Sequence, residues 1–111
     1  MSNFWKTSIP TSNYFAVIFI STRSNDLDGY ASMDERTIEK VKTLDGFLGY
    51  ESIKNGDDGI FISYWESMEA IENWKHDSMH KEAKSYGYSN WYTRIVSQIC
   101  HVNQSNEFIK K

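Results

Sequence analysis

Two stretches of this chain are apolar at nearly every position, whereas a strand at the surface of a domain normally alternates apolar and polar residues. They are residues 14–20, YFAVIFI, and residues 60–65, IFISYW. Successive side chains of a strand point to opposite faces of the sheet. Each of these strands is therefore expected to carry apolar side chains on both faces, and both faces need to be covered.

The pattern along the rest of the chain predicts alternating strands and helices. Strands are expected over residues 13–22, 47–54, 60–65 and 91–103, helices over 30–44, from 68 past 74 and over 78–86, and a hairpin turn at 55–59. Asp28 and Ser67 are candidate N-caps of the first two helices. Met68, Ile71 and Trp74 follow the helical repeat and are expected to form a buried stripe.

The order strand, helix, strand, strand, helix, strand predicts an α+β domain of the ferredoxin-like βαββαβ type, with a four-stranded antiparallel sheet and both helices on one face. The other apolar face then needs a partner, and a second copy of the chain is the simplest one. We therefore predict a homodimer joined through the sheet face. The domain is expected to span residues 14–103, between a flexible N-terminal arm (1–13) and a C-terminal tail (104–111).

Composition narrows the class of protein. The chain has 111 residues, the length of one domain, and its formal net charge of −3 argues against nucleic acid or a membrane as a partner. The longest apolar run, residues 14–20, is too short to cross a bilayer. A single cysteine, Cys100, cannot form an internal disulfide, so we expect a cytoplasmic location. Four Trp, seven Tyr and six Phe predict an aromatic pocket or interface.

Three segments resemble the antibiotic biosynthesis monooxygenase (ABM) family of dimeric α+β barrels. They are the GFLGYES strand of residues 46–52, the strand-to-helix junction ISYWESMEAIENW of residues 62–74, and the interval from Trp74 to His80. The resemblance covers residues 14–103 and implies the dimeric barrel fold. Members of the family include cofactor-independent monooxygenases of phenolic or quinol-type molecules and haem-degrading enzymes, so the resemblance implies either activity.

Within that family, the monooxygenase branch is similar in having a Trp on the second helix near the substrate, and Trp74 matches it. The same branch has a Tyr six residues later and an Asn one turn earlier, where this chain has His80 and Ala70. The haem-degrading branch is similar through Trp65 and Trp74, but the position of its axial His is Lys84 here. An ammonium group does not ligate haem iron. We therefore expect no cofactor, unless His80 replaces the haem ligand from one turn earlier.

His80 is the candidate catalytic base, because an unperturbed imidazole accepts a proton at neutral pH. Trp74, Trp65 and Tyr64 are the candidates that shape a cavity for a small aromatic molecule. The alternatives are a surface role for His80 and a core-packing role for Trp74. On a straight helix these two side chains would lie about 120° apart. They converge on one cavity only if the helix breaks within the KHDS segment, residues 75–78.

Other chemistry-bearing residues give weaker signals. His76 and His80 have a spacing that suits a metal on one helix face, but the sequence offers no third ligand, so we expect no metal site. Cys100 and His101 are neighbours on a strand and face opposite sides, so they cannot form a nucleophile–base pair. An aromatic cluster before the last strand is expected either to close a pocket mouth or to pack on the partner subunit. Its members are Tyr86, Tyr88, Trp91 and Tyr92.

Two functions stay open on this basis. One is an oxidoreductase that uses O₂ to oxidise a small electron-rich aromatic molecule; the other is a non-catalytic small-molecule-binding dimer. Retention of Trp74, with the ionisable His80 six positions on, favours the enzyme. The absence of the Asn and Tyr of the monooxygenase branch favours the binding protein. A haem-binding or haem-degrading protein is a third and weaker alternative.

Overall fold

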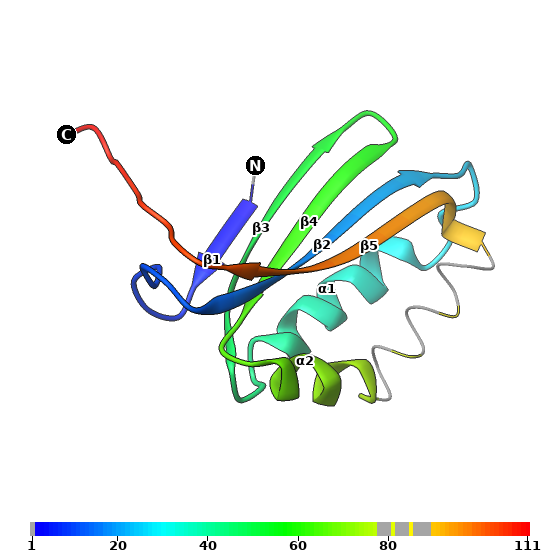
Figure 1. Ribbon diagram of the computed structural model, residues 1–111. Helices are drawn as coiled ribbons and strands as arrows, with labels where there is room; N and C mark the ends of the chain where they lie inside the picture. The colour runs from blue at the N-terminus through cyan, green and yellow to red at the C-terminus, as the bar shows by residue number, and fades with distance from the viewer. Residues whose placement is uncertain (1, 78–80, 82–84, 86–89) are drawn as a thin grey trace.

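The computed structural model describes residues 2–77, 81, 85 and 90–111. Within these ranges the elements are β1 (Ser2–Trp5), β2 (Tyr14–Arg23), α1 (Tyr30–Val41), β3 (Phe47–Asn55), β4 (Asp58–Trp65), α2 (Met68–Lys75) and β5 (Tyr92–Val102) (Figure 1). The helical stretch that the sequence predicts over 78–86 lies mostly outside the described residues.

The strands form one antiparallel sheet with the order β1-β3-β4-β2-β5. Both helices lie on the same face of this sheet (Figure 1). This arrangement confirms the predicted α+β, ferredoxin-like fold. The sheet has five strands rather than the predicted four, because β1 extends it beyond β3.

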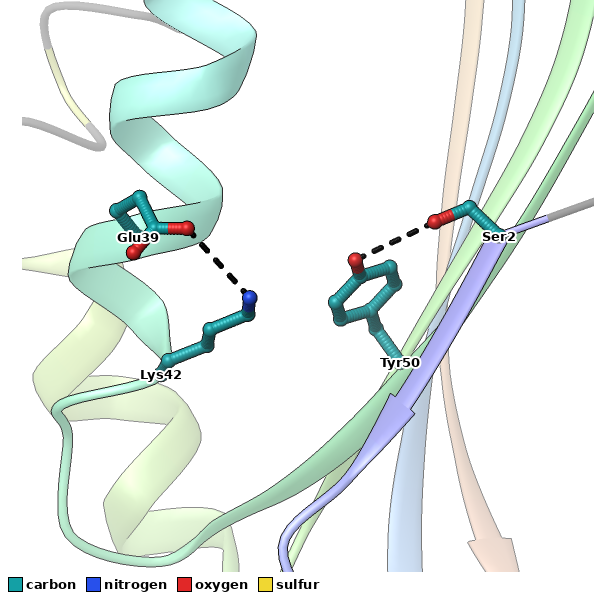
Figure 2. Close-up of polar contacts among 4 residues, drawn as sticks. All are labelled: Ser2, Glu39, Lys42 and Tyr50. Atoms are coloured by element: carbon teal, nitrogen blue, oxygen red, sulfur yellow. Dashed lines mark hydrogen bonds and ion pairs between the residues drawn. The ribbon is translucent and has the colours of Figure 1, made fainter.

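Strand β1 lies in the N-terminal arm, where the sequence pattern predicts no strand. Phe4 stacks near Phe47 and Tyr50, with ring centroids 6.4 and 6.2 Å apart. The Oγ of Ser2 lies 3.3 Å from the phenol oxygen of Tyr50 (Figure 2). Four residues are too few to carry a strand pattern. They form a strand because the edge of β3 offers N–H and C=O groups that would otherwise be unpaired.

The end of α1 approaches the same strand from the helical layer. Lys42 caps α1, and its Nζ lies 4.7 Å from the centroid of the Phe4 ring. The same Nζ lies 3.5 Å from a carboxylate oxygen of Glu39, one turn earlier (Figure 2). A cation over an aromatic face is attracted by the charge distribution of the ring. Strand β1 is thus held by both layers of the domain.

The two helices begin in different ways. In α2, the Oγ of Ser67 accepts a hydrogen bond from the N–H of Ala70 at 3.1 Å, which confirms the predicted N-cap. In α1, the N-cap is Gly29, whose φ of 79° lies in the left-handed region that glycine adopts without strain. No side chain caps this helix, so the prediction that Asp28 does so is wrong.

The buried face of α2 differs by one position from the predicted stripe. Ile71 and Trp74 are buried, but Met68 is 39 % exposed, and Ala70 is buried in its place. Ala70 lies close to Gly46 in the loop before β3. A Cβ added at Gly46 would lie 2.6 Å from the Cβ of Ala70. The small residue at position 70 is therefore what lets the loop and the helix approach each other.

The main core lies between this end of the sheet and the two helices. Its fully buried members are Val41, Phe47, Tyr50, Trp65, Ala70, Ile71 and Trp74. Within the described ranges neither helix could cross a membrane, since α1 has 12 residues and α2 has 8.

The opposite face of the sheet is apolar as well, as the two uninterrupted apolar strands predict. Cross-strand pairing aligns four aliphatic side chains across β3, β4, β2 and β5, in the order Ile53, Ile60, Ile20 and Val96. Ile53 and Ile60 are exposed to solvent in the single chain. We call this surface the open face.

Candidate functional site: a cavity between sheet and helices

A cavity of about 600 Å³ lies between the helix-covered face of the sheet and the helices α1 and α2. It exists because the sheet carries small side chains at its centre. Ser21 of β2 is paired with Gly59 of β4, and Ser63 lies further along β4 on the same face. Protein interiors are otherwise close-packed, so small residues on the sheet leave a hollow when the helices above cannot move closer.

The cavity has two chemically different ends. The end near α2 has apolar walls, and Lys75 and His76, at the end of α2, also line the cavity there; the walls are Val17, Ile38, Val41, Phe61, Ile71 and Trp74. The end near the β3–β4 hairpin is polar and aromatic and is lined by Arg23, Tyr30, Asp34, Lys54, Trp91 and Tyr92. Pockets for small molecules commonly combine apolar walls with a few polar groups that fix the orientation of the ligand.

Trp74 and Trp65 lie together at the apolar end. Their ring centroids are 6.4 Å apart and their planes are 29° from parallel. Trp74 lines the cavity and is 8 % exposed, whereas Trp65 is 0 % exposed and packs behind it. The indole N–H of Trp65 donates to the Oγ of Ser63 at 2.8 Å. Trp74 is thus a wall of the cavity, and Trp65 supports that wall from the core.

Tyr64 lies on the other face of the sheet, because it precedes Trp65 by one residue in β4. Its ring stacks on Trp5 of β1 with centroids 4.5 Å apart and lies 6.0 Å from the ring of Tyr14. Burial raises the pKa of Tyr64 to about 12, with additional contributions from Glu51 and Tyr14. Tyr64 therefore belongs to the open face and is not among the described residues that line the cavity with Trp74.

His80, the predicted catalytic base, lies outside the described residues. Helix α2 does end where the sequence predicts a break. Its last residue is Lys75, and the N–H of His76 still donates to Glu72 at 3.2 Å. The N–H of Asp77 then donates to Trp74 at 3.0 Å, the shorter spacing of a tightened last turn. Helix α2 thus ends within the KHDS segment.

The polar end of the cavity joins residues from four different elements. The Nζ of Lys54 lies 3.7 Å from a carboxylate oxygen of Asp34 and 5.1 Å from the centroid of the Tyr30 ring. Arg23 lies over the same ring, with its guanidinium carbon 5.8 Å from the centroid. Burial raises the pKa of Tyr92, and the adjoining Tyr30 and Asp34 raise it further, while Arg23 lowers it. A side-chain hydrogen bond between Tyr92 and Tyr30 also raises the pKa of Tyr92, so the two phenols are joined to each other at this end of the cavity.

The sequence analysis did not single out Arg23, Tyr30 or Lys54. Arg23 and Lys54 each read as an ordinary residue near the end of a strand, and Tyr30 has only a place in the apolar repeat of the first helix. One signal was available for Arg23, which continues the odd-numbered positions of the first apolar strand and therefore shares a face with Val17. The aromatic cluster was predicted to close a pocket or to meet the partner, and its member Trp91 lines the cavity, as Tyr92 does.

The remaining candidates lie apart from this site or at its rim. His76 lines the rim of the cavity and is exposed, with its Nε2 3.9 Å from a carboxylate oxygen of Glu72. No group of three His, Cys, Asp or Glu residues that could hold a metal occurs in the described part of the chain. Cys100 pairs with Ala16 and His101 with Phe15, so these neighbours face opposite sides of the sheet.

Comparison with known proteins identifies the family. Residues 13–86 match the family model described as antibiotic biosynthesis monooxygenase. The chain belongs to the antibiotic biosynthesis monooxygenase family. A curated relative, the uncharacterized protein YqjZ of Bacillus subtilis (strain 168), is 39 % identical over 100 residues, which cover 89 % of this chain and 88 % of the relative.

Solved structures share the ABM fold at much lower identity. Rv0793 of Mycobacterium tuberculosis superimposes with a TM-score of 0.75 at 11 % identity, over 85 % of this chain and 99 % of that one. SnoaB of Streptomyces nogalater, a cofactor-independent oxygenase, superimposes with a TM-score of 0.72 at 11 % identity, over 85 % of this chain and 97 % of its own. At these identities the similarity establishes the ABM architecture, while the chemistry has to be inferred from the cavity.

Proposed function

We propose that this ABM-family chain is a cofactor-independent monooxygenase that oxidises a small aromatic or quinol-type molecule in the cavity between the sheet and the helices. The observation that carries the proposal is the cavity itself. It is large enough for a bicyclic or tricyclic molecule, it is bounded by Trp74, and it has apolar walls at the α2 end. The reported oxygenase activity of SnoaB, a protein of the same fold, agrees with this choice.

The chemistry needs no cofactor when the substrate supplies the electrons. A quinol that loses a proton is electron-rich, and O₂ can oxidise it to a hydroxyquinone, with one oxygen atom entering the ring and the other leaving as water. The protein then has to bind the rings, keep water out and accept a proton. Trp74 supplies an aromatic wall, Trp65 holds that wall, and His80 is the proposed proton acceptor.

The active form in this proposal is a homodimer joined through the open face. Ile53 and Ile60 would each leave water on dimerisation, together with the half-buried aliphatic side chains beside them. Burial of such side chains contributes on the order of 2 kcal/mol each. The single thiol at Cys100 is consistent with a reducing cytoplasm, which we include as part of the proposal.

Oxygen uptake tests the proposal directly. The purified protein is incubated with a panel of naphthoquinols, and enzyme-dependent O₂ consumption is measured together with incorporation of ¹⁸O from ¹⁸O₂. We expect one labelled oxygen atom per product molecule. His80→Ala should lower turnover by about 10²-fold, the usual scale for a lost general base. His101→Ala, a change of the same residue type at an exposed position outside the cavity lining, is the matched control and should leave turnover unchanged.

A second function is favoured by one specific observation. Ala70 stands where the monooxygenase branch that this chain resembles has an Asn, and it is buried. The chain therefore lacks the polar side chain that this branch has one turn before Trp74. This favours a non-catalytic dimer that binds the same class of molecule. Binding of quinols without enzyme-dependent O₂ uptake would select this alternative over the monooxygenase.

A further inference from the structure

The described residues that line the cavity have a charge balance opposite in sign to that of the chain. The whole chain has 12 Lys and Arg against 15 Asp and Glu. Among the described residues that line the cavity, the Lys and Arg side chains outnumber the carboxylates; they are Arg23, Lys54, Lys75 and Lys81, against Asp34 alone. A concave, partly apolar site with an excess of one charge concentrates ligands of the opposite charge.

These charges are not all balanced by neighbours. Lys54 is paired with Asp34 at 3.7 Å, and Lys75 with Glu72 at 3.4 Å. Arg23 instead donates to the backbone oxygen of Gly56 and takes part in none of the ion pairs within the described part of the chain. A guanidinium has five N–H donors in a planar fork. Arg23 therefore keeps donors and a full positive charge available at the polar end of the cavity.

Two phenols lie beside this guanidinium. The rings of Tyr30 and Tyr92 meet edge to face with centroids 6.1 Å apart, and both residues line the cavity. The two phenols are also hydrogen-bonded to each other, which is one cause of the raised pKa of Tyr92 and leaves one O–H of the pair for a ligand. A cation with a neighbouring phenol donor matches a carboxylate, which accepts several hydrogen bonds and binds Arg in two-pronged geometry.

The cavity is also elongated. Val17 and Arg23 both line it and lie six residues apart on β2, which is roughly 20 Å along a strand. The positive end and the apolar Trp74 end are thus separated by more than the width of a single ring. A ligand that uses both ends needs an extended aromatic body with its acidic group at one extremity.

We propose that the ligand of this cavity is an elongated aromatic anion, with a carboxylate bound at the Arg23–Tyr30–Tyr92 end and fused rings extending toward Trp74. The inference rests on the proposed function, since it concerns the same cavity, and it narrows the substrate class from aromatic molecules to aromatic acids. It gives Arg23 a binding role that selects the ligand and holds it by its acidic end.

Calorimetric titration with two probes of the same ring system tests the inference. One probe is 6-hydroxy-2-naphthoate and the other is 2-naphthol, which lacks only the carboxylate and is neutral at pH 7. We expect the naphthoate to bind at least tenfold more tightly, because hydrogen bonds to a charged group are stronger than those between neutral groups. Arg23→Gln should remove most of that difference, Arg23→Lys should restore part of it, and affinity for 2-naphthol should change less than twofold in both variants.

Arg36→Gln is the matched control, since Arg36 is an exposed residue of α1 outside the cavity lining, and it should leave both affinities unchanged. Retained binding of 2-naphthol to Arg23→Gln shows that the variant is folded with an intact cavity. Equal affinities of the wild-type protein for both probes would overturn the aromatic-acid inference while leaving the proposed function standing. An equal loss of naphthoate binding in Arg36→Gln would also overturn it. Failure of both probes to bind at millimolar concentration would overturn the inference and the proposed function together.

Discussion

The two faces of the sheet are both apolar, yet they have different shapes. On the open face, Ile60 and Ile20 are neighbours in a continuous row of β-branched side chains. On the helix-covered face, one residue away along the same strands, the neighbours are Gly59 and Ser21. The first pair fills its face with branched side chains, and the second pair leaves the floor of the cavity of about 600 Å³.

The polarity of the residues along a strand and the sizes of their side chains therefore determine different properties of the sheet. Alternation along a strand determines which residues share a face. The sizes of the residues on that face then determine whether it is flat or hollow, because helices rest on the tallest side chains and leave space above the shortest. A flat apolar surface suits a second protein surface, and a hollow one suits a small molecule.

Substitution of a core residue on the helix-covered face should cause the greatest loss of stability. Trp65→Ala removes a side chain that is 0 % exposed and packs against Phe47 and Trp74. We expect the free energy of unfolding to fall by roughly 3–5 kcal/mol, as for other truncated core aromatics. Chemical denaturation measures the change, with the exposed neighbour Glu66→Ala as control. A loss below about 1 kcal/mol would mean that Trp65 does not support the cavity wall.

A charge on the open face should prevent the proposed dimer from forming. Ile60 is 41 % exposed in the single chain, so Ile60→Glu should be tolerated by the fold but should place a charge in the proposed interface. Light scattering is expected to give twice 13.0 kDa for the wild-type protein and 13.0 kDa for the variant. Leu27→Glu, at a residue 37 % exposed in the loop before α1, should stay dimeric. A monomeric wild-type protein at micromolar concentration would refute the dimer.

Loss of the Ser63 hydroxyl at the cavity floor should cause a smaller loss of stability. Ser63→Ala removes the acceptor of the Trp65 indole N–H and leaves that buried donor without a partner. We expect a loss of about 1–3 kcal/mol in the free energy of unfolding. Ser21→Ala is the matched control, because Ser21 is equally buried on the same face but accepts no hydrogen bond from Trp65. Equal effects of the two substitutions in denaturation experiments would argue against a special role for the Ser63 hydroxyl.

The smallest effect concerns the open face and pH. The folded-state pKa of Tyr64 is raised to about 12 from the usual 10.0, so the native state retains a proton that the unfolded state has lost. The contribution of Tyr64 to stability is therefore complete below pH 10 and declines as the pH rises toward 12. Tyr64→Phe should make the stability curve flatter between pH 10 and 12. Parallel curves for both proteins in denaturation series would contradict this assignment.

Much of the fold follows from local pattern. The apolar strands, the Ser67 cap and the hairpin between Asn55 and Asp58 all form as predicted, because each depends on residues close in sequence. Strand β1 could not be predicted, since its formation depends on the free edge of β3. The prediction that Asp28 caps α1 was wrong, because the N-cap is Gly29 in the left-handed region and no side chain caps the helix.

The site could be predicted only in part. The helical repeat predicts that Trp74 is buried. Tyr64 and Trp65 are consecutive in a strand, so alternation of side chains places them on opposite faces of the sheet. The polar end of the cavity could not be predicted, because Arg23, Tyr30 and Tyr92 come together only when β2, α1 and β5 pack. Tyr92 lies far from Arg23 and Tyr30 in the sequence, and contacts over such a separation leave no local pattern.

Small aromatic molecules are proposed to bind between the sheet and the helices, and NMR can locate such binding by residue. Isoleucine methyl groups report on the two faces separately: Ile38, Ile71 and Ile95 line the cavity, whereas Ile18, Ile20 and Ile62 lie on the open face. NMR spectra of methyl-labelled protein are recorded during titration with 2-naphthol. We predict saturable shifts and ligand-to-methyl contacts for the first group, with little change in the second. Shifts confined to the open-face methyl groups, or no shifts in either group, would contradict the account.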